Sequence, residues 1–77
     1  MTLTLTDLQY RILELIVENS DADLERFNRA DSLVQDLEPT ATITEIQCAL
    51  AVLEKKRFIT RSSTKFYSPT QRGRNEL

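Results

Sequence analysis

The sequence predicts a mainly α-helical α+β domain, in which three helices are followed by a small β-hairpin and a short C-terminal helix. The first observation is a pair of capping boxes, at residues 6–9 and 42–45, each of which precedes apolar residues at helical spacing. The second is a pair of runs rich in β-branched and aromatic residues, 58–61 and 65–68, that lie close enough in sequence to form a hairpin.

Length and composition limit the class of protein. The chain has 77 residues, of which 40% are hydrophobic, which is typical of a single folded domain over residues 1–77. It has one Cys and no His, so we expect no disulfide within the chain, no metal site and no cofactor. No apolar run approaches the roughly 18–20 residues of a membrane span, and no signal-peptide pattern is present, so we expect a cytoplasmic protein. The last predicted helix stops soon after it starts, so a piece of a longer protein would also fit.

Charge is divided unevenly along the chain, although the net charge is only −2. Residues 1–38 hold nine acidic and three basic side chains, whereas residues 39–77 hold three acidic and seven basic ones. Such a division favours one face that meets a polyanion and another that is turned away from it. The alternative is the uneven charge that small domains show by chance.

The first helix is predicted from its cap at Thr6 to residue 18 or 19. Its apolar arc is wide, because only Arg11, Glu14 and Glu18 form a polar face. Either several elements of the chain surround this helix, or part of the arc meets a second subunit. Under the second alternative we expect a homodimer whose interface contains the stripe Tyr10, Leu13 and Val17.

The second helix is predicted over residues 22–37, and the polar residues 20–23 are its expected start. Asp31 falls near the edge of its apolar side, which indicates a break near Asn28, with Asn28 or Asp31 capping a second piece.

The third helix begins after its cap at Thr42 and ends near Lys56. Residues 62–64 are the expected hairpin loop that follows it, and Thr70 is the expected cap of the last helix. On the third helix, the predicted core face is Ile43, Ile46, Ala49, Leu50 and Leu53, and the predicted outward stripe is Thr44, Gln47, Cys48, Ala51 and Lys55.

The run Ala49-Leu50-x-x-Leu53-Glu54-Lys55-Lys56-x-Phe58-Ile59, followed by Tyr67-Ser68-Pro69-Thr70-x-x-Gly73, resembles the winged helix-turn-helix superfamily. It is most similar to the PadR and MarR groups of transcriptional regulators. In those families the first run ends the recognition helix and opens the wing, and the second closes the wing and starts the next helix. Two residues depart from the pattern. Arg57 stands where the families usually have Gly, which predicts a positive φ at some strain, and Pro69 must lie at the end of its strand.

The resemblance implies a sequence-specific double-stranded DNA-binding protein, a transcriptional regulator that acts as a dimer. Its third helix would enter the major groove, and its basic wing would contact phosphates. The alternative is an adaptor that binds a protein through Cys48, Ala51, Val52 or Phe66. Neither residue types nor spacing indicate an enzyme, since there is no His and no glycine-rich phosphate loop. The expected DNA-binding residues are Thr40, Thr42, Thr44, Gln47, Lys55, Arg61, Lys65, Arg72 and Arg74.

Overall fold

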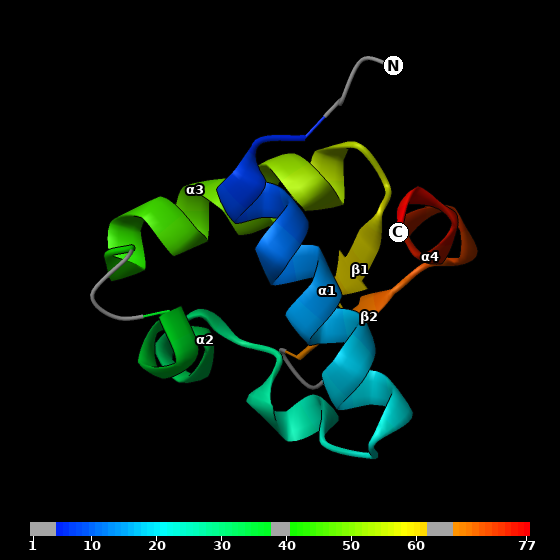
Figure 1. Ribbon diagram of the computed structural model, residues 1–77, viewed down its shortest axis with the longest axis horizontal. Helices are drawn as coiled ribbons and strands as arrows, with labels where there is room; N and C mark the ends of the chain where they lie inside the picture. The colour runs from blue at the N-terminus through cyan, green and yellow to red at the C-terminus, as the bar shows by residue number, and fades with distance from the viewer. Residues whose placement is uncertain (1–4, 38–40, 62–65) are drawn as a thin grey trace.

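The computed structural model of the chain describes residues 5–37, 41–61 and 66–77 (Figure 1). Within these ranges the protein is mainly helical and contains a two-stranded antiparallel hairpin, which confirms the predicted fold class. The elements are α1 (Asp7–Asp21), the 3-10 helix η1 (Glu25–Phe27), α2 (Ala30–Leu37), α3 (Ile43–Lys55), β1 (Ile59–Arg61), β2 (Tyr67–Pro69) and α4 (Gln71–Glu76).

Helix α1 starts as predicted but ends later. Its capping box is formed, because the Gln9 N–H donates to Thr6 Oγ1 at 3.1 Å and the Thr6 N–H donates to Gln9 Oε1 at 3.2 Å. The helix continues through Asp21 and stops where Asp23 adopts a φ of 61°. Residues 20–23 therefore end α1 rather than start the second helix, and that prediction is wrong.

A single second helix over residues 22–37 is also wrong, whereas the predicted break is confirmed. Residues 25–27 form η1, and α2 begins only at Ala30. Asn28 lies at the break, but it does not cap α2. It is completely buried, and its side chain forms hydrogen bonds with the carbonyl oxygens of Ile16 in α1 and Tyr67 in β2.

Asn28 ties the first half of the chain to the hairpin. Its Nδ2 lies within hydrogen-bond distance of three acceptors that share its two hydrogens: the Tyr67 carbonyl oxygen at 2.8 Å, the Ile16 carbonyl oxygen at 3.3 Å and Ser20 Oγ at 3.3 Å. Its Oδ1 accepts from Asn19 Nδ2 at 2.9 Å. Its backbone oxygen accepts from the Tyr67 N–H at 2.9 Å. Both backbone polar groups of Tyr67 are thus satisfied by one residue, which fixes the start of β2 against the end of α1.

Helix α3 begins at the predicted cap and buries four of its five predicted core residues: Ile46, Ala49, Leu50 and Leu53. Ile43 is 40% exposed, so its assignment to the core is wrong. It is the first residue of α3, and the buried residues of the helix begin only at Ile46. After the helix ends, Arg57 has a φ of 66°, which confirms the predicted left-handed conformation.

The hairpin and α4 follow directly. Strands β1 and β2 pair with Ile59 opposite Pro69 and Arg61 opposite Tyr67. Strand β2 ends at Pro69, as predicted for a residue without an N–H. The predicted loop at residues 62–64 lies outside the described residues. Thr70 caps α4 as predicted, since its Oγ1 accepts from the Gly73 N–H at 3.0 Å.

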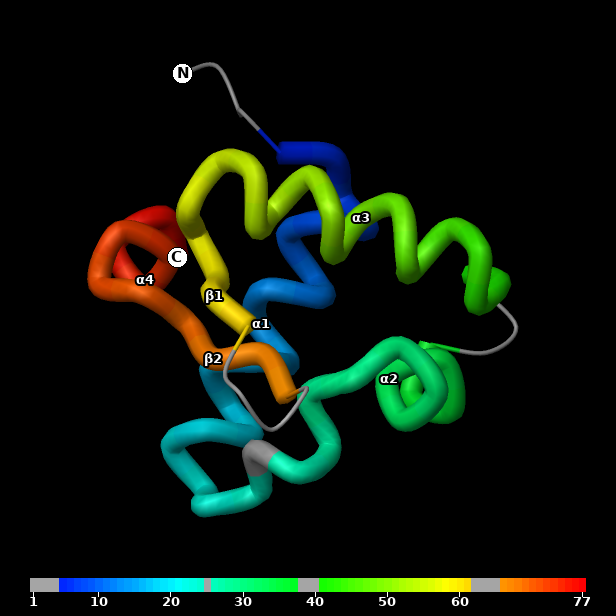
Figure 2. The backbone as a smooth tube through the Cα atoms, turned by 180° about the vertical axis from the view of Figure 1, so that it is seen from behind, coloured from blue at the N-terminus to red at the C-terminus, as the bar shows by residue number. Residues whose placement is uncertain are grey.

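The chain's own elements surround α1. Figure 1 shows α1 crossing α3 and the hairpin, and it also contacts η1. Figure 2 shows the opposite side, where β1 descends from the C-terminal end of α3 and β2 leads to α4. The wide apolar arc of α1 is buried by these contacts: Ile12, Leu13, Leu15 and Ile16 all belong to the core.

Candidate nucleic-acid interface

The outward face of α3 is covered by small and polar side chains. All five residues of the predicted stripe are exposed: Thr44, Gln47, Cys48, Ala51 and Lys55. The apolar face directly opposite holds the helix against the core, so the exposed stripe cannot turn inward without loss of that burial. A helix of 13 residues is about 20 Å long, and side chains of this size allow its backbone to approach base edges in a groove about 12 Å wide.

The N-terminus of α3 is occupied by its own capping residues. The Thr42 N–H and hydroxyl both donate to Glu45 Oε1, at 2.9 and 3.1 Å, and Thr42 Oγ1 accepts from the Glu45 N–H at 3.3 Å. A phosphate at Thr42 would meet the Glu45 carboxylate, so Thr42 is left out of the interface proposed below. Thr40, the second predicted phosphate contact, lies outside the described residues.

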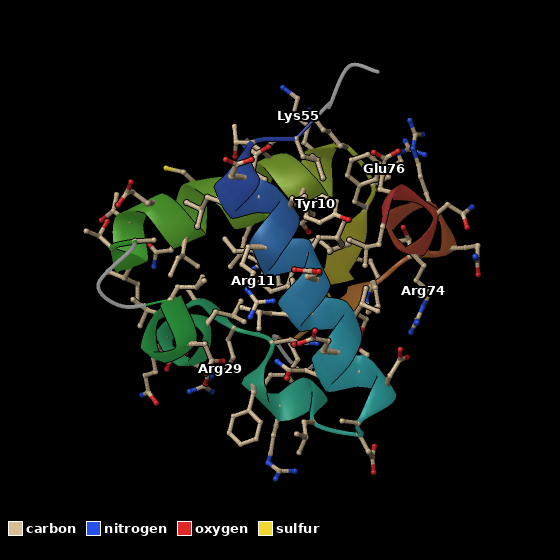
Figure 3. All side chains as sticks on the ribbon, in the orientation of Figure 1. Tyr10, Arg11, Arg29, Lys55, Arg74 and Glu76 are labelled. Atoms are coloured by element: carbon tan, nitrogen blue, oxygen red, sulfur yellow. The ribbon has the colours of Figure 1, made fainter. Side chains whose placement is uncertain are left out.

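The C-terminal end of α3 gathers positive charge. Lys55, Lys56 and Arg57 are all exposed, and Figure 3 shows Lys55 pointing away from the body of the molecule. Arg72 of α4 comes to the same end, with its guanidinium carbon 5.7 Å from the centre of the Phe58 ring. Lys56, Phe58, Arg72 and Glu76 line one shallow hollow there.

One basic residue of the hairpin is described, and it is anchored by an aromatic ring. The Arg61 guanidinium carbon lies 5.9 Å from the centre of the Tyr67 ring, and the two residues are directly opposite each other in the hairpin. Since Asn28 holds Tyr67 in place, the position of Arg61 depends on that network. Lys65, the other predicted basic residue of the hairpin, lies outside the described residues.

Arg74 does not join the other basic residues. Its Nη1 lies 2.9 Å from Asp21 Oδ1, in an ion pair between α4 and the end of α1. Figure 3 shows Arg74 at a different side of the molecule from Lys55. Because Arg74 already pairs with Asp21, it is left out of the interface proposed below.

The predicted dimer stripe is mostly used inside the chain. Leu13 is completely buried, so its assignment to an interface with a second copy is wrong. Tyr10 and Val17 are partly buried against the same core. Tyr10 points from α1 toward α4 (Figure 3), and its hydroxyl lies 3.5 Å from the Leu77 carbonyl oxygen. The sequence shows the width of the apolar arc but not which elements cover it.

The residues named for a protein partner are not equally accessible. Cys48 and Ala51 are exposed on α3, whereas Val52 and Phe66 are half-buried. Ile43, which sequence reasoning placed in the core, is a large hydrophobic residue that α3 exposes. The sequence signal that could have found it is its position inside the capping box, as the first residue after the cap Thr42.

One ion pair in the acidic half changes the pKa of a carboxyl group. Arg29 donates two hydrogen bonds to the Asp31 carboxylate, at 2.9 and 2.7 Å, and these hold the pKa of Asp31 below its usual value. Asp31 lies on α2, in the first turn, and takes no part in the positive end of α3.

Among residues 5–37, 41–61 and 66–77, no three Cys, Asp or Glu side chains come together where they could hold a metal ion. None of the helices in these ranges combines the length and the apolar character that crossing a bilayer requires. Comparisons of the chain with protein-family models, with curated proteins and with solved structures gave no match.

Proposed function

We propose that the protein binds double-stranded DNA as a small transcriptional regulator, with α3 in the major groove and basic side chains on the flanking phosphates. The observation that carries this proposal is the exposed face of α3. Its side chains are small enough for the helix to enter the major groove, and exposed cations follow at the C-terminal end of the helix. The order α3, β1, β2 and α4 supports a winged helix-turn-helix arrangement.

Within this proposal the residues have distinct roles. Gln47 and Thr44 contact base edges, because an amide can pair with adenine and a Thr methyl can touch thymine. Lys55 and Arg72 neutralise phosphates beside the end of α3, and Arg61 does so from the hairpin. Dimerisation through the Tyr10, Leu13 and Val17 stripe is not part of the proposal. The expected location remains the cytoplasm.

A titration against mixed-sequence duplex DNA, followed by fluorescence anisotropy at several salt concentrations, tests the proposal. With about three phosphate contacts, the logarithm of the association constant should fall with the logarithm of salt concentration with a slope of about −3. Arg61→Gln should weaken binding to every duplex and reduce the slope by about 0.9.

Arg26→Gln is the matched control, because Arg26 also lies over an aromatic ring, 4.7 Å from the centre of Phe27. It belongs to η1, in the acidic half of the chain, and should leave binding unchanged. Absence of salt-dependent binding by the unaltered protein would exclude the DNA-binding proposal. Equal weakening by Arg26→Gln and Arg61→Gln would exclude the assigned face.

A second candidate function is a protein-binding adaptor, which the exposure of Ile43, Cys48 and Ala51 along α3 favours. An adaptor would show no duplex binding even at low salt. Ile43→Ser would then abolish capture of the partner, whereas the same change in a DNA-binding protein would leave duplex affinity nearly unchanged.

A further inference from the structure

The end of α3 places a bulky cationic residue in a conformation that suits glycine. The Arg57 N–H donates to the Glu54 carbonyl oxygen and the Phe58 N–H donates to the Leu53 carbonyl oxygen, both at 3.0 Å. This pair of bonds is the Schellman motif, whose left-handed residue is usually Gly. With a φ of 66°, Arg57 brings its Cβ close to the following carbonyl oxygen, which disfavours any larger residue.

Helix α1 ends in the same motif with a residue that tolerates it better. Asp23 has a φ of 61°, its N–H donates to the Ser20 carbonyl oxygen, and the Leu24 N–H donates to the Asn19 carbonyl oxygen. Asp is enriched in the left-handed region because its short side chain bonds locally. Arg has no short side chain that could bond locally in this way. Its presence at residue 57 is therefore explained by something other than backbone conformation.

The surroundings of Arg57 supply that reason. Its carbonyl oxygen accepts from the Thr70 hydroxyl at 2.6 Å, which joins the end of α3 to the start of α4. The next residue, Phe58, is buried beneath the guanidinium of Arg72, and Lys56 and Arg72 line the same hollow. Two cations from two elements, Lys56 and Arg72, therefore line this hollow with Glu76, and the exposed Arg57 follows Lys56 directly in the chain.

We propose that Arg57 is a phosphate-binding residue at the end of α3, where the exposed cations Lys56 and Arg72 also lie. The proposal rests on the DNA-binding function proposed above and extends it to a residue not assigned to the interface by sequence. A guanidinium can donate two parallel hydrogen bonds to one phosphate, and Gly or a neutral side chain offers none. Arg57 is thus retained for its side chain although its backbone conformation favours glycine.

Three substitutions at residue 57 separate the side chain from the backbone. Arg57→Gly removes both the charge and the unfavourable Cβ, so duplex affinity should fall while the melting temperature rises by about 4 °C. Arg57→Gln removes only the charge, so affinity should fall equally with no gain in melting temperature. Arg57→Lys keeps the charge and should retain most of the affinity. In both neutral variants the salt slope should fall by about 0.9.

The measurements are anisotropy titrations with mixed-sequence duplex DNA and thermal unfolding followed by circular dichroism. If the unaltered protein binds duplex DNA and Arg57→Gly and Arg57→Gln bind equally well, the phosphate-binding role is overturned while the DNA-binding function stands. If the unaltered protein binds no duplex, both proposals fall together. A lower melting temperature for Arg57→Gly would overturn the argument from conformation. Arg26→Gln, which removes one charge from η1, should change neither quantity.

Discussion

Asn28 is the residue on which the connection between the acidic helices and the hairpin depends. It is the polar side chain that the core contains among the described residues, and each of its amide atoms has a partner. A buried amide of this kind stabilises the fold only while all its bonds are made, because unpaired buried carbonyl groups are costly.

Asn28→Ala should therefore destabilise the protein by about 2–3 kcal/mol, since the Ile16 and Tyr67 carbonyl oxygens lose a buried donor. Urea unfolding followed by circular dichroism measures the change. Asn75→Ala is the control, because the exposed Asn75 accepts one bond from Gln71, at 3.1 Å. Its effect should stay within about 0.5 kcal/mol. Similar losses in the two variants would contradict the role given to Asn28.

Sequence reasoning found the break at Asn28 but not the role of its side chain. A polar residue among apolar ones at helical spacing is a local signal, and it predicts an interruption. The partners Ile16 and Tyr67 lie 12 and 39 residues away in sequence, so no local pattern brings them together. The positive φ of Arg57 was predictable, by contrast, because it depends only on residues that are neighbours in the chain at the end of a helix.

At the scale of elements, the helix starts were the most predictable features. Both capping boxes are closed between residues three apart, so the sequence alone specifies them. The end of α1 and the position of η1 were not predictable in the same way. Residues 20–23 are mostly polar and acidic, which fits the start of a helix. The same residues also fit the exposed end of a helix, and here they form the end of α1.

Thr42→Ala removes the cap of α3 and should destabilise the protein by about 1 kcal/mol, which lowers the melting temperature by roughly 4–8 °C. Thr44→Ala is a matched control, because it removes an exposed hydroxyl two residues later and improves helix propensity. The order of the two effects should be reversed for duplex affinity, which Thr44→Ala lowers and Thr42→Ala leaves unchanged. Thermal unfolding and anisotropy together check this pair, and a loss of stability in both variants would contradict it.

Across the whole molecule, the division of charge is the property that sequence reasoning described best. Lys55 and Lys56 lie at the end of α3 and Arg72 lies beside Lys56, whereas Arg74 of α4 pairs with Asp21. That pairing is not predictable from sequence, because it requires knowing that α4 packs near the end of α1. Leu13 illustrates the same limit, since the width of an apolar arc does not say what covers it.

The acidic residues near the proposed interface should weaken DNA binding. Glu45→Gln keeps a capping residue at the third position of α3, because Gln also closes a capping box. It removes a carboxylate that repels a phosphate, so affinity should rise about twofold, which corresponds to about 0.5 kcal/mol of repulsion at about 8 Å in water. Anisotropy titration at low salt measures it. Glu18→Gln, on the exposed side of α1, is the control, and an equal gain there would show a nonspecific effect of net charge.

The one glycine of the chain lies in a helix and not in a turn. A Cβ on residue 73 would overlap the carbonyl oxygen of Phe58, so α4 can approach the first strand only because a hydrogen atom stands where a methyl group would be. The approach of α4 also determines where Arg72 lies over the Phe58 ring. The placement of a charged group on the surface therefore depends on the smallest side chain in the sequence, which is the next residue of the same short helix.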